Sequence, residues 1–220
     1  MVGAVFIGTF LPLVLLMLLL RHSRPVFASF CWGMLAFLLV YVTSPTLYRI
    51  LGIDDVIEFT AVFVGPPYEE FLKALPLVVA AVFAQRSLIP FFYILGMASG
   101  IGFSIEENLN FLIRFHQNDG DSMTLMILRS FSTCLMHGVA TGLIGYSLTL
   151  AKRRKGLIVF LFPAIGWSIA TFYHAFFNWL MLQQQMVIGL LIALIAFFAL
   201  LFIMKQVEGK APEVQGTIWQ

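Results

Sequence analysis

Long apolar runs recur along the whole 220-residue chain, and they restrict its possible folds more than any other feature. A transmembrane α-helix needs about 17–25 mostly apolar residues. Seven runs reach this length: Val2–Leu20, Val26–Thr43, Ile57–Ala84, Pro90–Arg114, Thr124–Leu150, Leu157–Leu182 and Met186–Met204. Only 11% of the residues are charged, whereas soluble domains carry roughly 25%. We therefore predict an all-α, polytopic bundle of about seven transmembrane helices over residues 1–204.

Basic residues are concentrated in alternate connections between these runs, which predicts an orientation. The basic connections and the C-terminal end contain Arg21, Arg24, Arg86, Lys152, Arg153, Arg154, Lys155, Lys205 and Lys210. The intervening connections contain Arg49 and the acidic residues Asp54, Asp55, Glu58, Asp119 and Asp121. Because positive loops stay in the cytoplasm, we expect the N-terminus outside and the C-terminus inside. Residues 205–220 are then predicted to form a mobile cytoplasmic tail.

Other features exclude several classes of protein. Arg21 follows the first run instead of preceding it, which argues against a cleaved signal peptide. Cys31 and Cys134 lie in different runs and indicate no disulfide framework. The net charge of +2 comes mostly from predicted cytoplasmic loops, so no nucleic-acid partner is expected. The expected environment is the lipid bilayer of a cell membrane, most simply a prokaryotic cytoplasmic membrane.

Adjacent glutamate pairs and single histidines interrupt four of the apolar runs. They are Glu69 and Glu70 in the third run, Glu106 and Glu107 in the fourth, His137 in the fifth and His174 in the sixth. A charged side chain at the bilayer centre costs roughly 2.5–3.5 kcal/mol on insertion scales, so such residues usually face the protein interior and have a function. The pattern predicts one polar site inside a helix bundle.

Helix counting places Glu107 and His174 at similar depths and His137 somewhat deeper. Gly65–Pro67 should break the third run, so that a new helix begins at Tyr68 with both glutamates in its first turn, where the helix dipole favours carboxylates. At 1.5 Å per residue, Glu107 lies about 10 Å, His174 about 12 Å and His137 about 20 Å from the predicted outer ends of their helices. We therefore expect the groups to meet in the outer half of the membrane.

The glutamate pairs allow both a structural and a catalytic interpretation. Lys73 lies three and four residues after Glu70 and Glu69, so an ion pair on one helix face could simply fix the packing. Alternatively, a glutamate in a partly dry site can activate water as a general base. Adjacent residues point about 100° apart, so only one member of each pair can aim at a central cavity.

The histidines also leave alternatives open. His137 and His174 could form hydrogen bonds between helices, transfer protons, stabilise an oxyanion or bind a metal. Two histidines and a carboxylate match a catalytic zinc site, but the chain has no HExxH pair. It also lacks GxSxG and a pair of membrane aspartates. Elimination favours a glutamate mechanism, and no metal or cofactor is assigned.

Two sequence elements resemble signatures of a known family. EEFLKAL, at Glu69–Leu75, resembles the EExxK signature of the PrsW family of intramembrane proteases. GFSIEENLNF resembles the FxxxEN element of that family, with Phe103, Glu107 and Asn108 at the matching positions. CAAX-type and bacteriocin-processing membrane proteases are similar, but they usually carry His where this chain has Glu107. The resemblance therefore favours PrsW.

Two further elements follow in the order typical of PrsW. MHGVATGLIGY carries His137 and YHAFFN carries His174, so the resemblance covers roughly Pro67–Asn178. It implies a glutamic-type endopeptidase that makes the first cut in a single-pass membrane protein, such as an anti-sigma factor, on its extracytoplasmic side, in a stress response. The catalytic residues implied are Glu69, Glu70, Glu107, His137 and His174, supported by Lys73, Phe103, Asn108 and Asn178.

Three other functions stay open at this stage. A CAAX-like prenyl-protein protease would use a similar site. A non-catalytic scaffold, like the related scaffold subunit of gamma-secretase, need not keep both acidic pairs. A proton-coupled transporter could relay protons through buried Glu and His, although such proteins often contain inverted repeats and none is visible here.

Overall fold

The computed structural model describes residues 24–53, 57–83, 91–115, 122–152 and 154–208, together with Val14. These residues form α2 (Arg24–Leu51), α3 (Ile57–Phe59), the π-helix η1 (Thr60–Val64), α4 (Gly65–Phe83), α5 (Phe92–Phe115), α6 (Ser122–Lys152), α7 (Ile158–Leu182) and α8 (Met186–Glu208). The predicted all-α class is confirmed for this part of the chain. The first predicted helix, Val2–Leu20, lies outside the described residues apart from Val14. The predicted tail from Lys205 is helical as far as Glu208, and the rest of it lies outside them.

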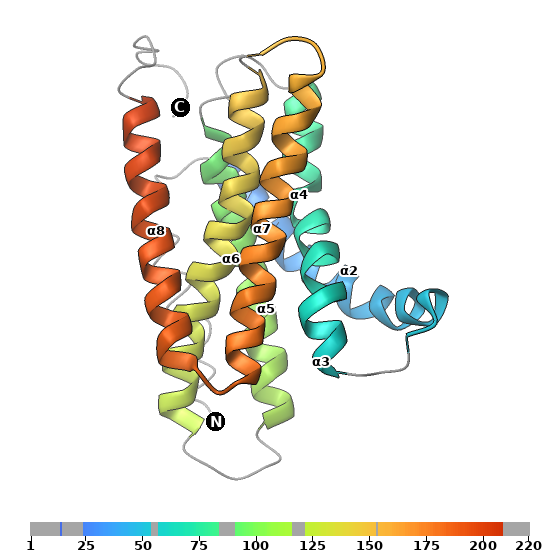
Figure 1. Cartoon of the computed structure of the whole chain (residues 1–220). Coiled ribbons are helices and arrows are strands. Elements are labelled where there is room, and N and C mark those ends of the chain that lie inside the picture. The colour runs from blue at the N-terminus through green and yellow to red at the C-terminus, as the bar shows by residue number, and fades with distance from the viewer. Residues whose placement is uncertain are drawn as a thin grey trace.

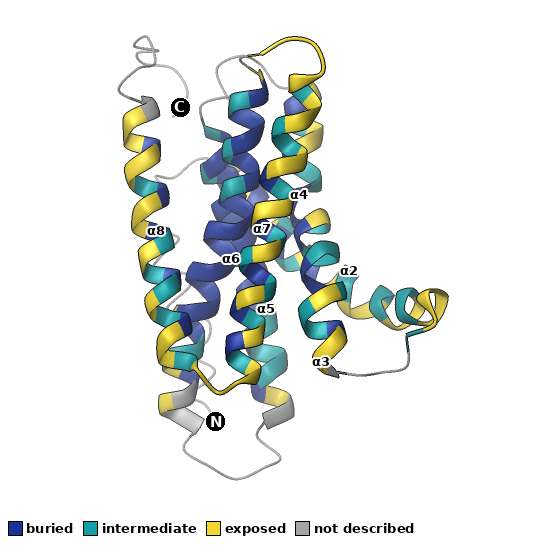
Figure 2. Cartoon of the chain, viewed as in Figure 1, coloured by how far each residue is buried: buried dark blue, intermediate teal, exposed yellow. Residues whose placement is uncertain are grey.

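Helix α6 forms the centre of the bundle. It contacts α4, α5, α7 and α8, and these helices run alongside it in Figure 1. Figure 2 shows α6 mostly buried, whereas α7 and α8 carry exposed faces. Helix α2 packs on α5 and α4, but it passes behind the bundle and its C-terminal half projects from the side (Figure 1). The predicted span, Val26–Thr43, lies within α2 but stops eight residues before the helix ends at Leu51.

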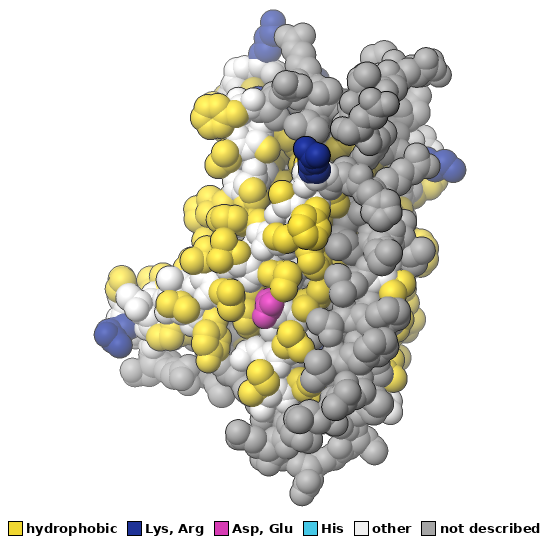
Figure 3. Space-filling model, turned by 180° about the vertical axis from the view of Figure 1, so that it is seen from behind, with side chains coloured by type: hydrophobic (Ala, Val, Ile, Leu, Met, Phe, Trp, Pro, Cys, Tyr) yellow, Lys and Arg dark blue, Asp and Glu magenta, His cyan; other side chains and the backbone are white. Residues whose placement is uncertain are grey.

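The described part of the chain includes four helices long and apolar enough to cross a membrane: α2, α6, α7 and α8. Large apolar side chains such as Phe172 and Ile195 are exposed on the outer faces of α7 and α8, as expected for lipid contact. Figure 3 shows the same apolar character on the opposite side of the molecule, with basic side chains near its upper end and at the projecting end of α2. The protein is therefore a multi-pass membrane protein.

The helix break predicted at Gly65–Pro67 is wrong, because the chain stays helical from Ile57 to Phe83. The Gly65 N–H bonds to the Thr60 carbonyl, five residues back. Pro66 has no N–H, so the Ala61 carbonyl lacks a backbone donor in this π-helical turn. The side-chain amide of Asn178 donates to that carbonyl at 2.9 Å. The turn is thereby completed from α7, and the glutamates do not lie at a free helix end.

Another proline of α4, Pro76, creates a further link between helices. Pro76 lies inside α4 and leaves the Leu72 carbonyl without its usual donor. Trp32 of α2 donates its Nε1–H to this carbonyl at 2.9 Å. One residue further on, Ser99 of α5 donates to the Lys73 carbonyl at 3.0 Å. Since unpaired backbone groups are costly in a membrane, the prolines fix how α4 sits against its neighbours.

Small residues of α5 set its distance from α6. A side chain added at Gly100 would collide with the backbone carbonyl of His137, and one added at Gly96 with that of Thr141. Such glycines let two membrane helices approach closely. The close approach brings the His137 side chain within reach of the acidic residues on α4 and α5.

Candidate active site

Glu70 lies at the centre of a buried polar cluster and has no exposed surface. Its Oε1 is 2.5 Å from Lys73 Nζ and 2.9 Å from His174 Nδ1. Its Oε2 accepts a hydrogen bond from the Thr141 hydroxyl at 2.9 Å. Both oxygens are therefore occupied, and Glu70 is suited to hold other groups in position.

Lys73 connects the two halves of this cluster. Its ammonium also donates to His137 Nδ1 at 2.8 Å and lies 4.4 Å from the centre of the Phe103 ring. Because Nδ1 accepts this hydrogen bond, the His137 proton resides on Nε2. That nitrogen donates to Glu107 Oε2 at 2.9 Å. Lys73 thus sets the tautomer of His137 and points its N–H toward α5.

Two residues that the sequence reasoning did not single out complete the cluster. Arg129 of α6 pairs with Glu107 Oε1 at 3.2 Å and stacks on Phe111, with 4.0 Å between its guanidinium and the ring centre. Thr141 follows His137 by four residues and bonds to Glu70. An arginine within an apolar run was the available signal for the first, and the helical spacing from His137 was the signal for the second.

Glu69 differs from Glu70 in its surroundings. Its Oε2 lies 3.7 Å from His174 Nε2 and is buried without a hydrogen-bond partner among the described residues. His174 donates its Nδ1–H to Glu70, so its Nε2 is left as an acceptor. Two hydrogen-bond acceptors therefore face each other. This arrangement needs either a hydrogen-bond donor such as water or a cation between them.

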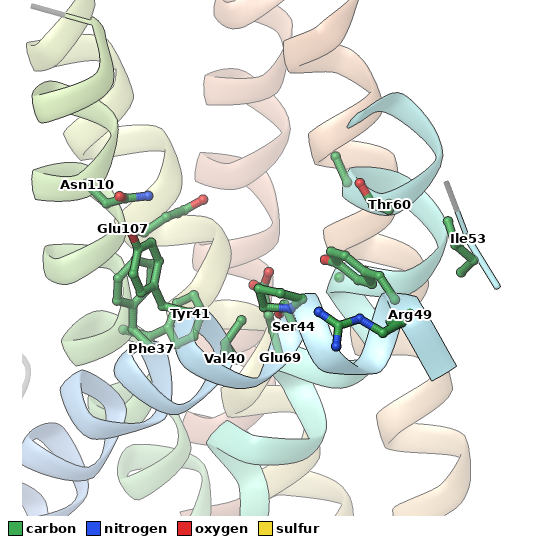
Figure 4. A pocket seen from close by; sticks show the side chains of 15 residues that line it. Phe37, Val40, Tyr41, Ser44, Arg49, Ile53, Thr60, Glu69, Glu107 and Asn110 are labelled. Carbon is green, nitrogen blue, oxygen red and sulfur yellow. The ribbon is translucent and has the colours of Figure 1, made fainter. Parts of the chain in front are cut away.

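A cavity of about 820 Å³ opens beside these groups between α2, η1, α4 and α5. Glu69 and Glu107 both line it, and Figure 4 shows their side chains with those of α2 around the space. Its other lining residues are Phe37, Val40, Tyr41, Ser44, Pro45, Tyr48, Arg49, Ile53, Thr60, Ala61, Gly65, Phe103 and Asn110. The cavity therefore leaves open space beside both carboxylates.

The other predicted supporting residues lie around this cluster. Phe103 packs against His137, with 5.0 Å between the ring centres. Asn108 accepts a hydrogen bond from Thr133 at 3.0 Å and so links α5 to α6. Asn178 bonds to the Ala61 carbonyl, not to His174. Both asparagines therefore link neighbouring helices in this structure.

Three side chains of the cluster fit a divalent cation. Glu69, His137 and His174 each offer one ligand atom, and these atoms lie within 4.8 Å of one another. The bond from His174 Nδ1 to Glu70 resembles the carboxylate contacts that orient metal-binding histidines. The set of one carboxylate and two histidines is typical of catalytic zinc. His137 would have to give up one of its two present bonds to serve as a ligand.

Carboxylates and imidazoles gathered beside a cavity inside a membrane helix bundle make this protein a candidate intramembrane hydrolase. Within that class, residues 21–204 match the family described as PrsW family intramembrane metalloprotease. The chain belongs to this family, and the resemblance seen in the sequence is confirmed. No curated protein and no solved structure matches the chain.

Proposed function

We propose that this protein is an intramembrane endopeptidase in which Glu69 activates water for attack on a peptide bond. The observation that carries the proposal is that Glu69 Oε2 is buried, has no hydrogen-bond partner among the described residues, and faces His174 beside the cavity. A water within about 2.6–3.2 Å of both atoms can donate one proton to Glu69 and the other to His174. Glu70, with both oxygens occupied, positions His174 and does not act as the base.

The reaction then proceeds by proton transfer through Glu69. Its carboxylate takes a proton from the water as the water oxygen bonds to the peptide carbonyl carbon. The same proton passes to the peptide nitrogen as the carbon–nitrogen bond breaks, giving a carboxylic acid and an amine. His137 orients Glu107 through its Nε2–H, and Arg129 offsets the charge of that carboxylate.

A metal-dependent form of the site is a second candidate, favoured by the cluster of ligand atoms and by the family description. Glu69, His137 and His174 would hold the ion. A bound zinc ion would supply Lewis acidity and lower the pKa of a bound water to about 7. Glu70 and Thr141 would keep the same positioning role in this form, because their bonds to each other and to His174 do not depend on the ion.

The substrate that we propose is a single-pass membrane protein, cut on the extracytoplasmic side. The connection from α6 to α7 and the end of α8 share one end of the bundle (Figure 1), and both carry lysine or arginine. The positive-inside rule puts that end in the cytoplasm. His174 lies eight residues from the opposite end of α7, or about 12 Å. An anti-sigma-factor-like substrate is the form of this proposal that the family resemblance implies.

Cleavage after chelation distinguishes the two forms of the site. We expect purified protein in proteoliposomes to cut a single-pass model substrate at an unchanged rate after chelator treatment. The products are identified by mass spectrometry, and the metal content is measured on the same samples. The metal-free assignment would be wrong if chelation abolished cleavage and one equivalent of a divalent ion restored it. The His174→Ala protein should then fail to retain that ion. Failure to cut any single-pass substrate would instead favour a scaffold.

A further inference from the structure

One face of α2 forms a long wall of the cavity. The residues of this face recur at helical spacing from Phe37 to Arg49: Phe37, Val40, Tyr41, Ser44, Pro45, Tyr48 and Arg49. Twelve residues of helix correspond to about 18 Å, which is the length of about five residues of extended peptide. The wall is therefore long enough to run beside several residues of a substrate on one side of the cleaved bond.

The charges along this cavity are separated. Among the described residues that line it, Glu69 and Glu107 are the acidic ones and Arg49 is the one basic residue. Figure 4 shows the Arg49 guanidinium turned back along α2, toward Ser44 and Glu69. Arg49 takes part in none of the ion pairs formed among the described residues. A guanidinium in this setting is free to bind a planar anion with two parallel hydrogen bonds.

A hydrogen bond between helices holds the middle of α2 beside the part of α4 that carries Glu69. The Thr43 hydroxyl lies 2.6 Å from the Tyr68 hydroxyl, which puts this part of α2 beside the α4 residue that precedes Glu69. From Ser44 to Arg49 the helix rises about 7.5 Å. An extended peptide advances about 3.3 Å per residue. A group bound at Arg49 would therefore lie two or three residues from the bond cut beside Glu69.

We propose that Arg49 is a specificity-determining residue that binds an Asp or Glu side chain of the substrate, two or three residues from the cleaved bond. This inference rests on the proposed function. A peptide carboxylate suits the position better than a lipid phosphate, because Arg49 shares one cavity with both glutamates of the site and its guanidinium points along that cavity. An acidic residue there also keeps the substrate from reversing its direction in the cavity, since the opposite end is acidic.

A charge exchange between enzyme and substrate tests the inference. Single-pass model substrates would carry Asp, Asn or Lys at each of the four positions on either side of the cleaved bond. We expect the wild-type protein to cut the Asp substrate at least about tenfold faster than the Lys substrate at one of these positions. Arg49→Glu should reverse the preference, and Arg49→Lys should retain it. Arg154→Glu is the matched control, because Arg154 is exposed in the connection between α6 and α7 and does not line the cavity.

Binding to Glu69→Gln protein separates recognition from hydrolysis. Fluorescent versions of the same substrates should bind this variant with the same preference for Asp, and adding Arg49→Glu should reverse it. If binding depends on the charge at position 49 but the wild-type protein cleaves none of the substrates, the recognition proposal is supported and the proposed function is wrong. Cleavage with a preference that ignores the Arg49 charge would overturn the recognition proposal alone. An equal loss for every substrate in Arg49→Glu would also overturn it and would indicate a structural or lipid-binding role.

Discussion

Glu69→Gln should reduce the cleavage rate by about 10²–10⁴-fold, the usual effect of losing a general base. Glutamine keeps the size of the side chain and much of its hydrogen bonding, but it cannot accept the proton from water. The fold should survive, because Glu69 is only partly buried and its Oε2 has no hydrogen bond to lose among the described residues. Initial rates in proteoliposomes, together with a thermal unfolding midpoint in detergent, measure both effects.

Glu106→Gln is the matched control for this variant. Glu106 belongs to the other adjacent pair of glutamates, is similarly half-buried, and does not line the cavity. It should therefore cut at close to the wild-type rate. Glu69→Gln protein that cleaves as fast as Glu106→Gln protein would rule out Glu69 as the base.

Lys73→Met should cause the largest loss of stability among single substitutions in the site. Lys73 and Glu70 form an ion pair with no exposed side-chain surface, and removing one partner of such a pair typically costs 3–5 kcal/mol. His137 would also lose the donor that fixes its tautomer. We expect a clearly lower unfolding midpoint and no detectable cleavage.

Lys205→Met supplies the comparison for Lys73→Met. It makes the same chemical change at an exposed position in the last turn of α8. Its unfolding midpoint should match that of the wild type. Equal midpoints for the two variants would show that the buried pair does not hold α4 in place.

The sequence was enough to predict that the polar residues of the site lie together, because polar groups are costly in the interior of a membrane. Glu70, Glu107, His137 and His174 come from separate helices, and each would be costly if left facing lipid. The structure joins Glu70 to His174 and Glu107 to His137 by hydrogen bonds, and Lys73 links the two pairs. The sequence alone could not say which glutamate of the first pair is free, because that depends on where Thr141 lies relative to α4.

The course of the helices could not be predicted in the same way. Gly65–Pro67 carries a strong local signal for a break, but Asn178, 117 residues from Ala61, supplies the hydrogen bond that keeps the helix continuous. The direction of α2 is also set at long range, by Trp32 and by the small residues of α5 that it meets. Local patterns fix the helix type, whereas partners distant in the sequence decide where a helix continues and how it crosses its neighbours.

A double-mutant cycle on Glu69 and His174 tests most directly whether they act on the same water. The cleavage rates of wild-type, Glu69→Gln, His174→Ala and doubly substituted protein are measured on one substrate in proteoliposomes. If the two residues act as a unit, the double variant should be about as slow as the slower single variant, because removing one partner already removes the shared function. If the two losses multiply, Glu69 and His174 act independently, and the site proposed here is wrong.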